Sequence, residues 1–557
     1  MSLTQLRPDG PPEKASQPSF TANDLTTEIT VSSLSSVSQK SVPKHTVSHD
    51  EATLVQGNAG TDGPRIILTE QSSPELLASA WPWWLKWTTL ICTFLVQISM
   101  NLNASLYANA QSGIRKEFGV SQIAAVSGSA VFLVTYAFGC ELWAPWSEEF
   151  GRKPVLQFSL LLVNLMCLPV ALARRSGKFH DILIGRAFGG LFSAGGSVTL
   201  GVVADMYTIR RQEYPLAFIV LSSVGGSIIG PIIGGFLETY LDWTWCIWVQ
   251  LIVGGSVQLL HLCLVPETRS PILLNFHAAK LRKNKQKETG ETINVYGPQE
   301  GRTCREILVP KDLLKLWMRP FRMFATERIV MVLSTLSGFS DALIFMQIQS
   351  LGLVFQIWDF TIIQIGLAFI SIGIGYLIGY LLFIPIISRN RALRAKNPHS
   401  EYAQYESRLW WLLFTAPLLP IGLLIFAWTS TPGSHWSGPM FGCILIGIAN
   451  YTIYMTTIDY MVAAYGPYSA SATGGNGFAR DFLAGALTWG AEPYYNAFSG
   501  PYRLQIANTV LACISLILVA ATYFVYFNGA TMRKNSPFAQ SLAHDIGDAD
   551  AGPSTTI

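Results

Sequence analysis

The chain alternates long apolar runs with short polar breaks from Trp81 to about residue 527. A helix needs about 20 apolar residues to cross the hydrocarbon core of a bilayer, and runs of this length recur throughout the region. We therefore predict twelve membrane-spanning helices. The predicted spans are residues 84–106, 124–143, 155–173, 182–204, 215–237, 245–265, 329–350, 361–387, 410–428, 437–459, 469–491 and 504–527.

Three polar stretches lie outside these spans. Residues 1–80 hold 22 serine or threonine residues and lack the apolar run of a signal peptide, which predicts a disordered tail. A central segment at 267–328 contains 13 lysine or arginine residues and separates a first half at 81–266 from a second half at 329–527. Residues 528–557 form a short C-terminal tail. This layout predicts an all-α integral membrane fold of two six-helix bundles, with a binding site where the bundles meet.

Positive charge predicts the orientation of the chain. Loops that stay in the cytoplasm are enriched in lysine and arginine, and the central segment holds the largest group of them. We therefore expect a multi-pass protein of the cell membrane with both tails in the cytoplasm. The vacuolar membrane or another internal membrane is the alternative location.

Composition agrees with a membrane protein and argues against other classes. Half of the residues are hydrophobic, only 13% are charged and the mean hydropathy is +0.34, a balance that is unusual in soluble domains. The net charge of +3 gives no reason to expect nucleic acid as a partner. The sequence contains no G-x-x-x-x-G-K-[ST] loop, so we expect an ion gradient rather than ATP as the energy source.

One loop has the spacing of an ion-pair latch. It follows the second span and reads Ala144-Pro-Trp-Ser-Glu-Glu-Phe-Gly-Arg-Lys-Pro154. The acid at 148 precedes the two bases by four and five residues, so these charges can pair in one conformation and separate in another. The glycine gives the turn backbone freedom, and an ordinary charged loop is the alternative. The predicted latch residues are Ser147, Glu148, Gly151, Arg152 and Lys153.

The fifth span carries a second pattern, Gly226-Ser-Ile-Ile-Gly-Pro-Ile-Ile-Gly-Gly235. Glycines spaced by four residues lie on one helix face and permit close packing of a neighbouring helix, while a proline weakens the local hydrogen-bond ladder. A purely structural packing face is the alternative to a role in transport. The residues of this pattern are Gly226, Gly230, Pro231, Gly234 and Gly235.

Five charged residues fall inside the predicted spans, where a charge costs at least about 2.5 kcal/mol and needs a partner, water or a purpose. They are Glu141, Arg186, Asp341, Arg480 and Asp481. Glu141 lies about 10 Å deeper along its helix than Glu148, and it could hold a proton in one conformation and release it in a wetter one. Arg480 and Asp481 are adjacent and point roughly 100° apart on a helix, so we expect each to pair with other residues.

These motifs resemble those of the major facilitator superfamily. The loop at 144–154 is similar to its loop-2/3 signature, the 226–235 pattern to the helix motif of its antiporters, and Arg186 to its fourth-helix arginine. Three further pieces resemble the fungal twelve-span drug:proton antiporter branch, namely Pro266-Glu-Thr268, Arg319-Pro-Phe321 and Glu406-Ser-Arg-Leu409. The resemblance covers about residues 80–530 and implies a transporter of drugs, polyamines or secondary metabolites.

The buried charges and the resemblance together assign candidate roles. The candidates for proton coupling are Glu141, Arg186 and Asp341. The resemblance implies that Arg186 is a cation facing the cavity, and a fixed bridge to backbone carbonyls is the alternative. The candidates for the substrate cavity are Asn103, Asn450, Tyr454, Arg480 and Asp481. Polar groups in spans also join helices to one another, which is the alternative role for these residues.

We expect a secondary active transporter, not an enzyme, that exports a small organic compound in exchange for protons. Its partners would be that compound, protons and membrane lipid, and we expect a monomer with no cofactor beyond the proton gradient. A uniporter or importer on the same fold is one alternative, which the direction of flux distinguishes. A membrane sensor that transports nothing is another.

Overall fold

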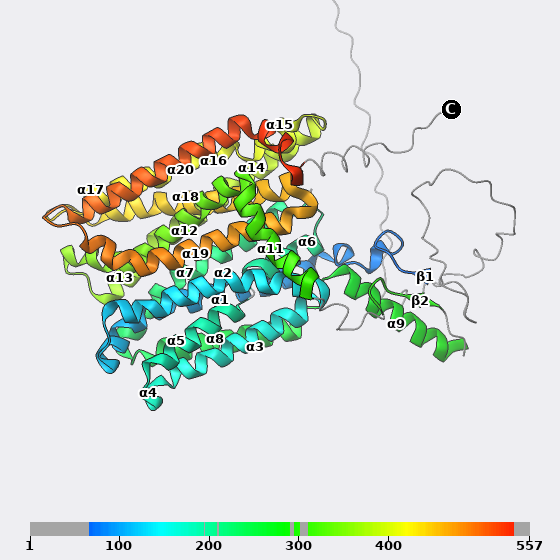
Figure 1. The fold of residues 1–557 in the computed structure, drawn as a ribbon, viewed down its shortest axis with the longest axis horizontal. Coiled ribbons are helices and arrows are strands. Elements are labelled where there is room, and N and C mark those ends of the chain that lie inside the picture. The colour runs from blue at the N-terminus through cyan, green and yellow to red at the C-terminus, as the bar shows by residue number, and fades with distance from the viewer. Residues whose placement is uncertain (1–65, 194, 209–210, 290–293, 301–309, 540–557) are drawn as a thin grey trace, which may run out of the picture. The chain divides into compact units, whose positions relative to one another are not determined.

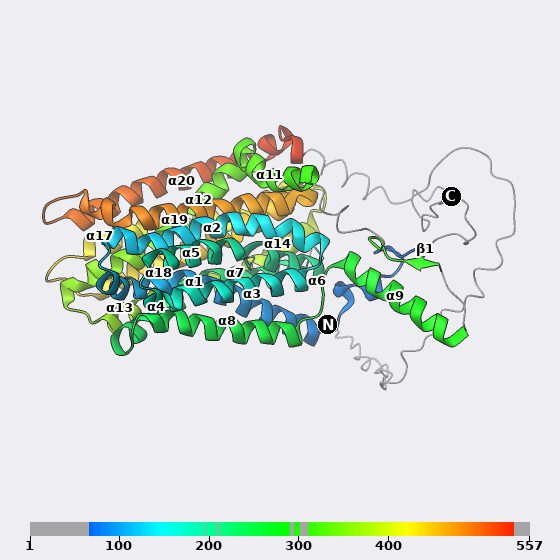
Figure 2. The ribbon, with the colours of Figure 1, turned by 60° about the horizontal axis from the view of Figure 1, so that its bottom comes forward.

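The computed structural model describes residues 66–193, 195–208, 211–289, 294–300 and 310–539. These residues belong to one compact unit and are mainly helical. Figure 1 shows their long helices side by side along a common direction. Figure 2 shows α19 lying between α2 and α12, and both of these helices contact it along its length. The all-α membrane fold expected from the sequence is confirmed.

The first half and the central segment contain the following elements. The helices are α1 (Trp83–Phe118), α2 (Gln122–Glu149), α3 (Arg152–Ala171), α4 (Ala173–Ser176), α5 (Phe179–Phe192), α6 (Gly195–Met206), α7 (Glu213–Tyr240), α8 (Thr244–Leu264), α9 (Ser270–Thr289) and α11 (Pro310–Thr326). The strands are β1 (Ile66–Ile67) and β2 (Val295–Tyr296), and the 3-10 turns are η2 (Pro74–Leu76) and η3 (Ala78–Ala80).

The second half is built in the same way. Its helices are α12 (Arg328–Phe355), α13 (Ile362–Ala368), α14 (Ile370–Lys396), α15 (Glu401–Gln404), α16 (Trp410–Thr415), α17 (Leu418–Thr429), α18 (Ser437–Tyr465), α19 (Ser469–Asn496) and α20 (Arg503–Lys534). Its 3-10 turns are η4 (Gln356–Trp358), η5 (Glu406–Arg408) and η6 (Gly466–Tyr468).

Within the described residues, eleven helical stretches are long and apolar enough to cross a membrane, and each coincides with a predicted span. Four of them join neighbouring helical elements: α5 with α6, α12 with η4, α13 with α14, and η5 with α16 and α17. The remaining predicted span, 469–491, corresponds to α19, which has 28 residues. α19 is less apolar because it carries Arg480, Asp481 and Glu492, and the first two face a cavity rather than lipid.

Local sequence signals fix several helix ends. α1 ends at Gly119, whose φ of 63° is readily adopted only by glycine, and its N–H donates to the Arg115 carbonyl. Ser121 caps α2 by accepting from the backbone N–H of Ala124. Gly151 has a φ of 98° between α2 and α3, so the backbone freedom expected of this glycine is used.

The glycine pattern of the fifth span packs α7 tightly against α1. A β-carbon at Gly226 would lie 2.6 Å from the Asn101 β-carbon, and one at Gly230 would lie 2.7 Å from the Ser105 β-carbon. Ser105 Oγ also donates to the Gly226 carbonyl at 3.0 Å. Gly235 faces the backbone of α13 in the second half. The close packing predicted from the spacing is therefore present.

Replacing Gly230 with valine should destabilise the protein by about 1–3 kcal/mol, the cost of overpacking a close contact. The physical reason is that the new side chain would collide with Ser105 and the backbone of Leu106. Thermal unfolding in detergent measures the change. The matched control is Gly255→Val on α8, because no heavy atom lies within 4 Å of a β-carbon there. Equal stability of the two variants would contradict the prediction.

Part of the N-terminal tail is ordered, so the prediction of disorder over residues 1–80 is wrong for residues 66–80. β1 pairs in parallel with β2 of the central segment, and Ala78 of η3 is fully buried. Lys86 Nζ donates to the Ser79 carbonyl at 2.6 Å. The apolar residues of this short stretch pack on the bundle, which composition averaged over the whole tail conceals. Residues 1–65 lie outside the described ranges.

The other polar segments also contain structure. In the central segment, Arg282 donates to the Val295 carbonyl at 2.6 Å and to the Glu300 carboxylate. The hydrogen bond from Arg282 to Glu300 holds the pKa of the Glu300 carboxyl below its usual value. α20 extends to Lys534 and so includes the first residues of the predicted C-terminal tail at 528–557. Arg533 in this extension is buried and forms an ion pair with Glu406. Residues from 540 onward lie outside the described ranges.

Candidate functional site

A cavity of about 480 Å³ lies between the two halves, within the usual size range of a small-molecule site. Its walls come from α2 and α6 of the first half and from α18 and α19 of the second. At the junction of α2 and α3, it is lined by Glu148, Arg152 and Arg269, and by Leu77 of the ordered N-terminal stretch. We call this the mouth. Its deep end is lined by Glu141, Tyr454, Arg480 and Asp481.

Glu141 is the least satisfied acid at the deep end. It is only 4% exposed, and its Oε1 has no hydrogen-bond partner among the described residues. The carboxylate lies against Gly474 of α19, where a β-carbon would sit 2.7 Å from Oε2. The absence of a side chain at Gly474 therefore leaves the space that the carboxylate occupies.

Arg480 lies between two acids and an aromatic ring. Its Nε is 3.6 Å from Asp341 Oδ2 on α12, and its Nη2 is 3.7 Å from Asp481 Oδ1. The guanidinium carbon is 4.1 Å from the ring centroid of Tyr454 on α18, within range of a cation–π contact. The expectation that Arg480 and Asp481 would not pair is therefore wrong, because the long arginine side chain can reach its neighbour despite the angle between them.

Asp341 and Asn450 lie behind this group. Asp341 contacts Arg480 but does not line the cavity, and it is 5% exposed. Asn450 Nδ2 donates to Ser340 Oγ at 3.0 Å, which joins α18 to α12. In this conformation Asn450 thus acts between helices, the alternative that the sequence left open.

Arg186 and Asn103 lie away from the large cavity. Arg186 Nη1 donates to the Asn103 carbonyl at 2.9 Å and to Asn103 Oδ1 at 2.8 Å, and Nε donates to the Gly128 carbonyl at 3.1 Å. The guanidinium carbon lies 4.5 Å and 4.1 Å from the ring centroids of Tyr107 and Phe132. This is the geometry of the bridge to backbone carbonyls rather than of a cation facing the cavity.

The predicted latch residues lie at the mouth, where Arg152 and Lys153 have other principal partners than Glu148. Arg152 is 3.9 Å from Glu148, but its Nε donates to Asp205 at 3.0 Å and its Nη1 to Ser147 at 2.6 Å. Lys153 Nζ donates to the Leu262 carbonyl instead of pairing with Glu148.

Glu267 accepts the backbone N–H groups of Arg152 and Lys153 at the start of α3. An acid in this position stabilises a helix N-terminus. Sequence reasoning missed the roles of Asp205 and Glu267. The only available signal was Pro266-Glu-Thr268, which resembled a family motif but did not indicate which residues Glu267 would contact.

A second ionic cluster joins the two halves near the start of α7. Glu213 is 2% exposed and faces three arginines of the second half. Its carboxylate is 2.7 Å from Arg391 Nε and 3.1 Å from Arg408 Nη1, and it also pairs with Arg394. Arg408 pairs in turn with Asp459 on α18. Sequence analysis identified only Arg408 of this cluster, as part of the Glu406-Ser-Arg-Leu409 motif, and not its partners, because the members lie far apart along the chain.

The arrangement suits proton binding and organic ligands. Two acids, one arginine and a tyrosine meet at the deep end, where the burial of their side chains strengthens the interactions between charges. In the described ranges, no group of three or more His, Cys, Asp or Glu side chains is placed to hold a metal ion. The residues at the deep end supply acid–base and hydrogen-bonding groups inside a cavity to which both halves contribute.

Known proteins share both the sequence pattern and the fold. A family model described as Major Facilitator Superfamily matches residues 89–488. The MFS-type transporter paaT of Penicillium rubens is 29% identical over 480 residues, covering 85% of this chain and 83% of its own. The efflux pump atB of Aspergillus terreus is 32% identical over 403 residues, covering 71% and 81%.

Among solved structures, the xylose transporter XylE from E. coli, in a partially occluded inward open conformation, matches with a TM-score of 0.54. Its sequence is 13% identical, and the match covers 79% of this chain and 97% of that one, so the likeness concerns the fold alone. The family model spans most of the chain, and the relatives are transporters rather than enzymes. This protein therefore belongs to the Major Facilitator Superfamily.

Proposed function

We propose that the protein exports a small organic compound in exchange for protons, by alternating access to the cavity between its two halves. The observation that carries this proposal is Glu141, a buried carboxyl with an unpartnered oxygen on the wall of a cavity to which both halves contribute. Two relatives whose names describe an efflux pump and an MFS-type transporter support the direction and the kind of activity.

The coupling follows from a change of surroundings at Glu141. A carboxyl closed off from water favours its protonated form, and one exposed to water or to a cation favours its ionised form. Arg480 and Asp481 lie on the same cavity wall, so substrate and proton would compete for one group of charges. Competition of this kind makes binding of one ligand favour release of the other.

The proposal includes location and orientation. Both termini lie in the cytoplasm, the protein resides in the cell membrane as a monomer, and the proton gradient is its only energy source. The mouth, at the junction of α2 and α3, then faces the cytoplasm, where substrate would enter. The substrate is a drug, a polyamine or a secondary metabolite, classes that fit a cavity of about 480 Å³.

Transport in everted membrane vesicles tests the proposal. A deletion strain screened against a panel of compounds would first supply a transported compound. When the vesicle interior is more acidic than the medium, we expect the compound to accumulate inside and a matching amount of protons to leave the vesicles. A protonophore should abolish both effects. Accumulation that is insensitive to the protonophore would overturn proton coupling. Flux only down the gradient of the compound would favour a uniporter, and net uptake into intact cells would favour an importer.

Gly474→Ala should lower proton-dependent transport by about tenfold, because its β-carbon would displace the Glu141 carboxylate at a cost of about 1–3 kcal/mol. Gly477→Ala is the matched control. Gly477 also lines the cavity, one turn further along α19, and no heavy atom lies within 4 Å of a β-carbon there. Initial rates in the same vesicles measure both variants, and an equal loss in the two would argue against a requirement for the position of Glu141.

A further inference from the structure

α11 carries an exposed apolar strip beside an exposed basic strip. Leu314 and Met318 are 56% and 53% exposed, and Ala325 is exposed on the same face of the helix. Lys315 and Arg322 are exposed one helical step away, roughly 40–100° around the axis. An apolar strip and a basic strip side by side are typical of a helix that lies at a membrane interface.

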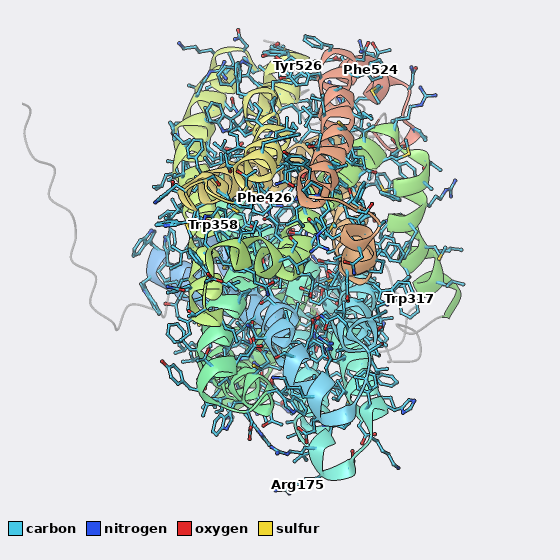
Figure 3. The ribbon with its side chains drawn as sticks, turned by 90° about the vertical axis from the view of Figure 1, so that its left-hand side faces the viewer. Arg175, Trp317, Trp358, Phe426, Phe524 and Tyr526 are labelled. Carbon is cyan, nitrogen blue, oxygen red and sulfur yellow. The ribbon has the colours of Figure 1, made fainter. Side chains whose placement is uncertain are left out.

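The side of α11 opposite the exposed strips is buried at Pro320 and Met323, which fixes the direction of the two strips. Between this buried side and the apolar strip, aromatic side chains pack against the bundle. Trp317 lies 6.2 Å from Trp146 on α2, measured between ring centroids. Phe321 lies 6.1 Å from Phe138 on α2 and 4.7 Å from Phe478 on α19, so α11 contacts both halves. Figure 3 shows Trp317 on α11 at the edge of the bundle.

The position of α11 along the chain places it at the membrane boundary. It ends at Thr326, and the membrane-spanning α12 begins two residues later at Arg328. Met323 is fully buried in the core of the bundle, so the helix lies on the bundle rather than apart from it. With α12 crossing the bilayer, the exposed side of α11 is expected to meet the zone where acyl chains give way to headgroups.

We propose that the exposed side of α11 binds anionic lipid headgroups of the adjacent leaflet, with its apolar strip against the acyl chains. Charge complementarity selects the lipid: Lys315 and Arg322 attract phosphate, and each basic side chain near an anionic surface strengthens binding about fivefold. A soluble protein partner is disfavoured, because it would have to bind an apolar strip that already faces lipid.

Lipid-dependent thermal unfolding of the purified full-length protein in neutral detergent tests this surface. A lipid that binds the folded state raises Tm by an amount set by the ratio of its concentration to its Kd, so a weaker site needs proportionally more lipid for the same shift. We expect phosphatidylglycerol to raise Tm and phosphatidylcholine to have little effect. In the double variant Lys315→Gln, Arg322→Gln, about 25-fold more phosphatidylglycerol should be needed for the same shift. The single variant Arg322→Gln should need about fivefold more.

Three comparisons make the result decisive. The control variant Lys283→Gln, Lys287→Gln removes the same charge from exposed positions on α9 and should keep the response to phosphatidylglycerol. Tm in phosphatidylcholine reports whether the α11 variants fold normally. Glycerol 3-phosphate, which lacks acyl chains, should produce no shift. An unchanged response in both α11 variants, an equal loss in the α9 control or an equal effect of glycerol 3-phosphate would each overturn the proposal.

Discussion

Replacing Glu141 with glutamine should abolish proton-driven transport while leaving exchange of substrate across the membrane largely intact. Glutamine keeps the shape of the side chain but cannot take up or release a proton. The carboxyl is buried and has an unpartnered oxygen, so the variant leaves no new unpaired charge behind. We expect the proton-dependent rate to fall by about 100-fold, the range over which removal of a proton-transfer group acts.

Two measurements separate coupling from general damage. Counterflow of labelled against unlabelled substrate needs no net proton movement and should persist in Glu141→Gln. Glu238→Gln is the matched control, because Glu238 lies on α7, accepts hydrogen bonds from Asn109 and Ser112, and does not line the cavity. If Glu141→Gln retained pH-dependent accumulation, Glu141 would not be the coupling residue, and Asp481 would be the next acid to test.

The spans could be predicted because an apolar run is a local property of the sequence. Their ends could not, since several helices continue through polar residues that the bundle buries. α1 was expected to end at residue 106 and continues to Phe118, because Tyr107, Gln111 and Ile114 are buried against neighbouring helices. α20 likewise continues beyond the last predicted span, because Arg533 near its end pairs with Glu401 and Glu406.

The site was predictable as a set of residues but not as a set of contacts. Charges inside apolar runs identified Glu141, Arg480 and Asp481, and these three do line the cavity. The contact of Arg480 with Asp341 joins positions 139 residues apart, and helical periodicity cannot predict such pairs. Arg186 met the same criterion of a buried charge, yet its partners are carbonyl groups and aromatic rings, which no charge pattern reveals.

Replacing Glu213 with glutamine should destabilise the protein by about 3–5 kcal/mol, the cost of leaving buried charges without their counter-ion. Glu213 is the acid that three arginines of the second half share, and two of these, Arg394 and Arg408, are largely buried. The neutral amide would remove the counter-ion that Arg391 and Arg394 share and leave Arg408 paired with Asp459 alone, so the guanidinium groups would repel one another. Because the cluster joins α7 to α14 and η5, the loss should fall on the contact between the halves.

Thermal unfolding in detergent measures the effect, and Asp242→Asn provides the control. Asp242 pairs with Arg174 at 3.1 Å, but the two side chains are 69% and 53% exposed, so solvent screens the pair and its loss should cost less than about 1 kcal/mol. A cysteine pair at Tyr214 and Ser388, whose hydroxyl groups lie 2.7 Å apart across the halves, would report the local separation. Glu213→Gln should reduce cross-linking of that pair and Asp242→Asn should not. Comparable stability of the two variants would mean that the Glu213 cluster holds the halves together no more strongly than an exposed ion pair.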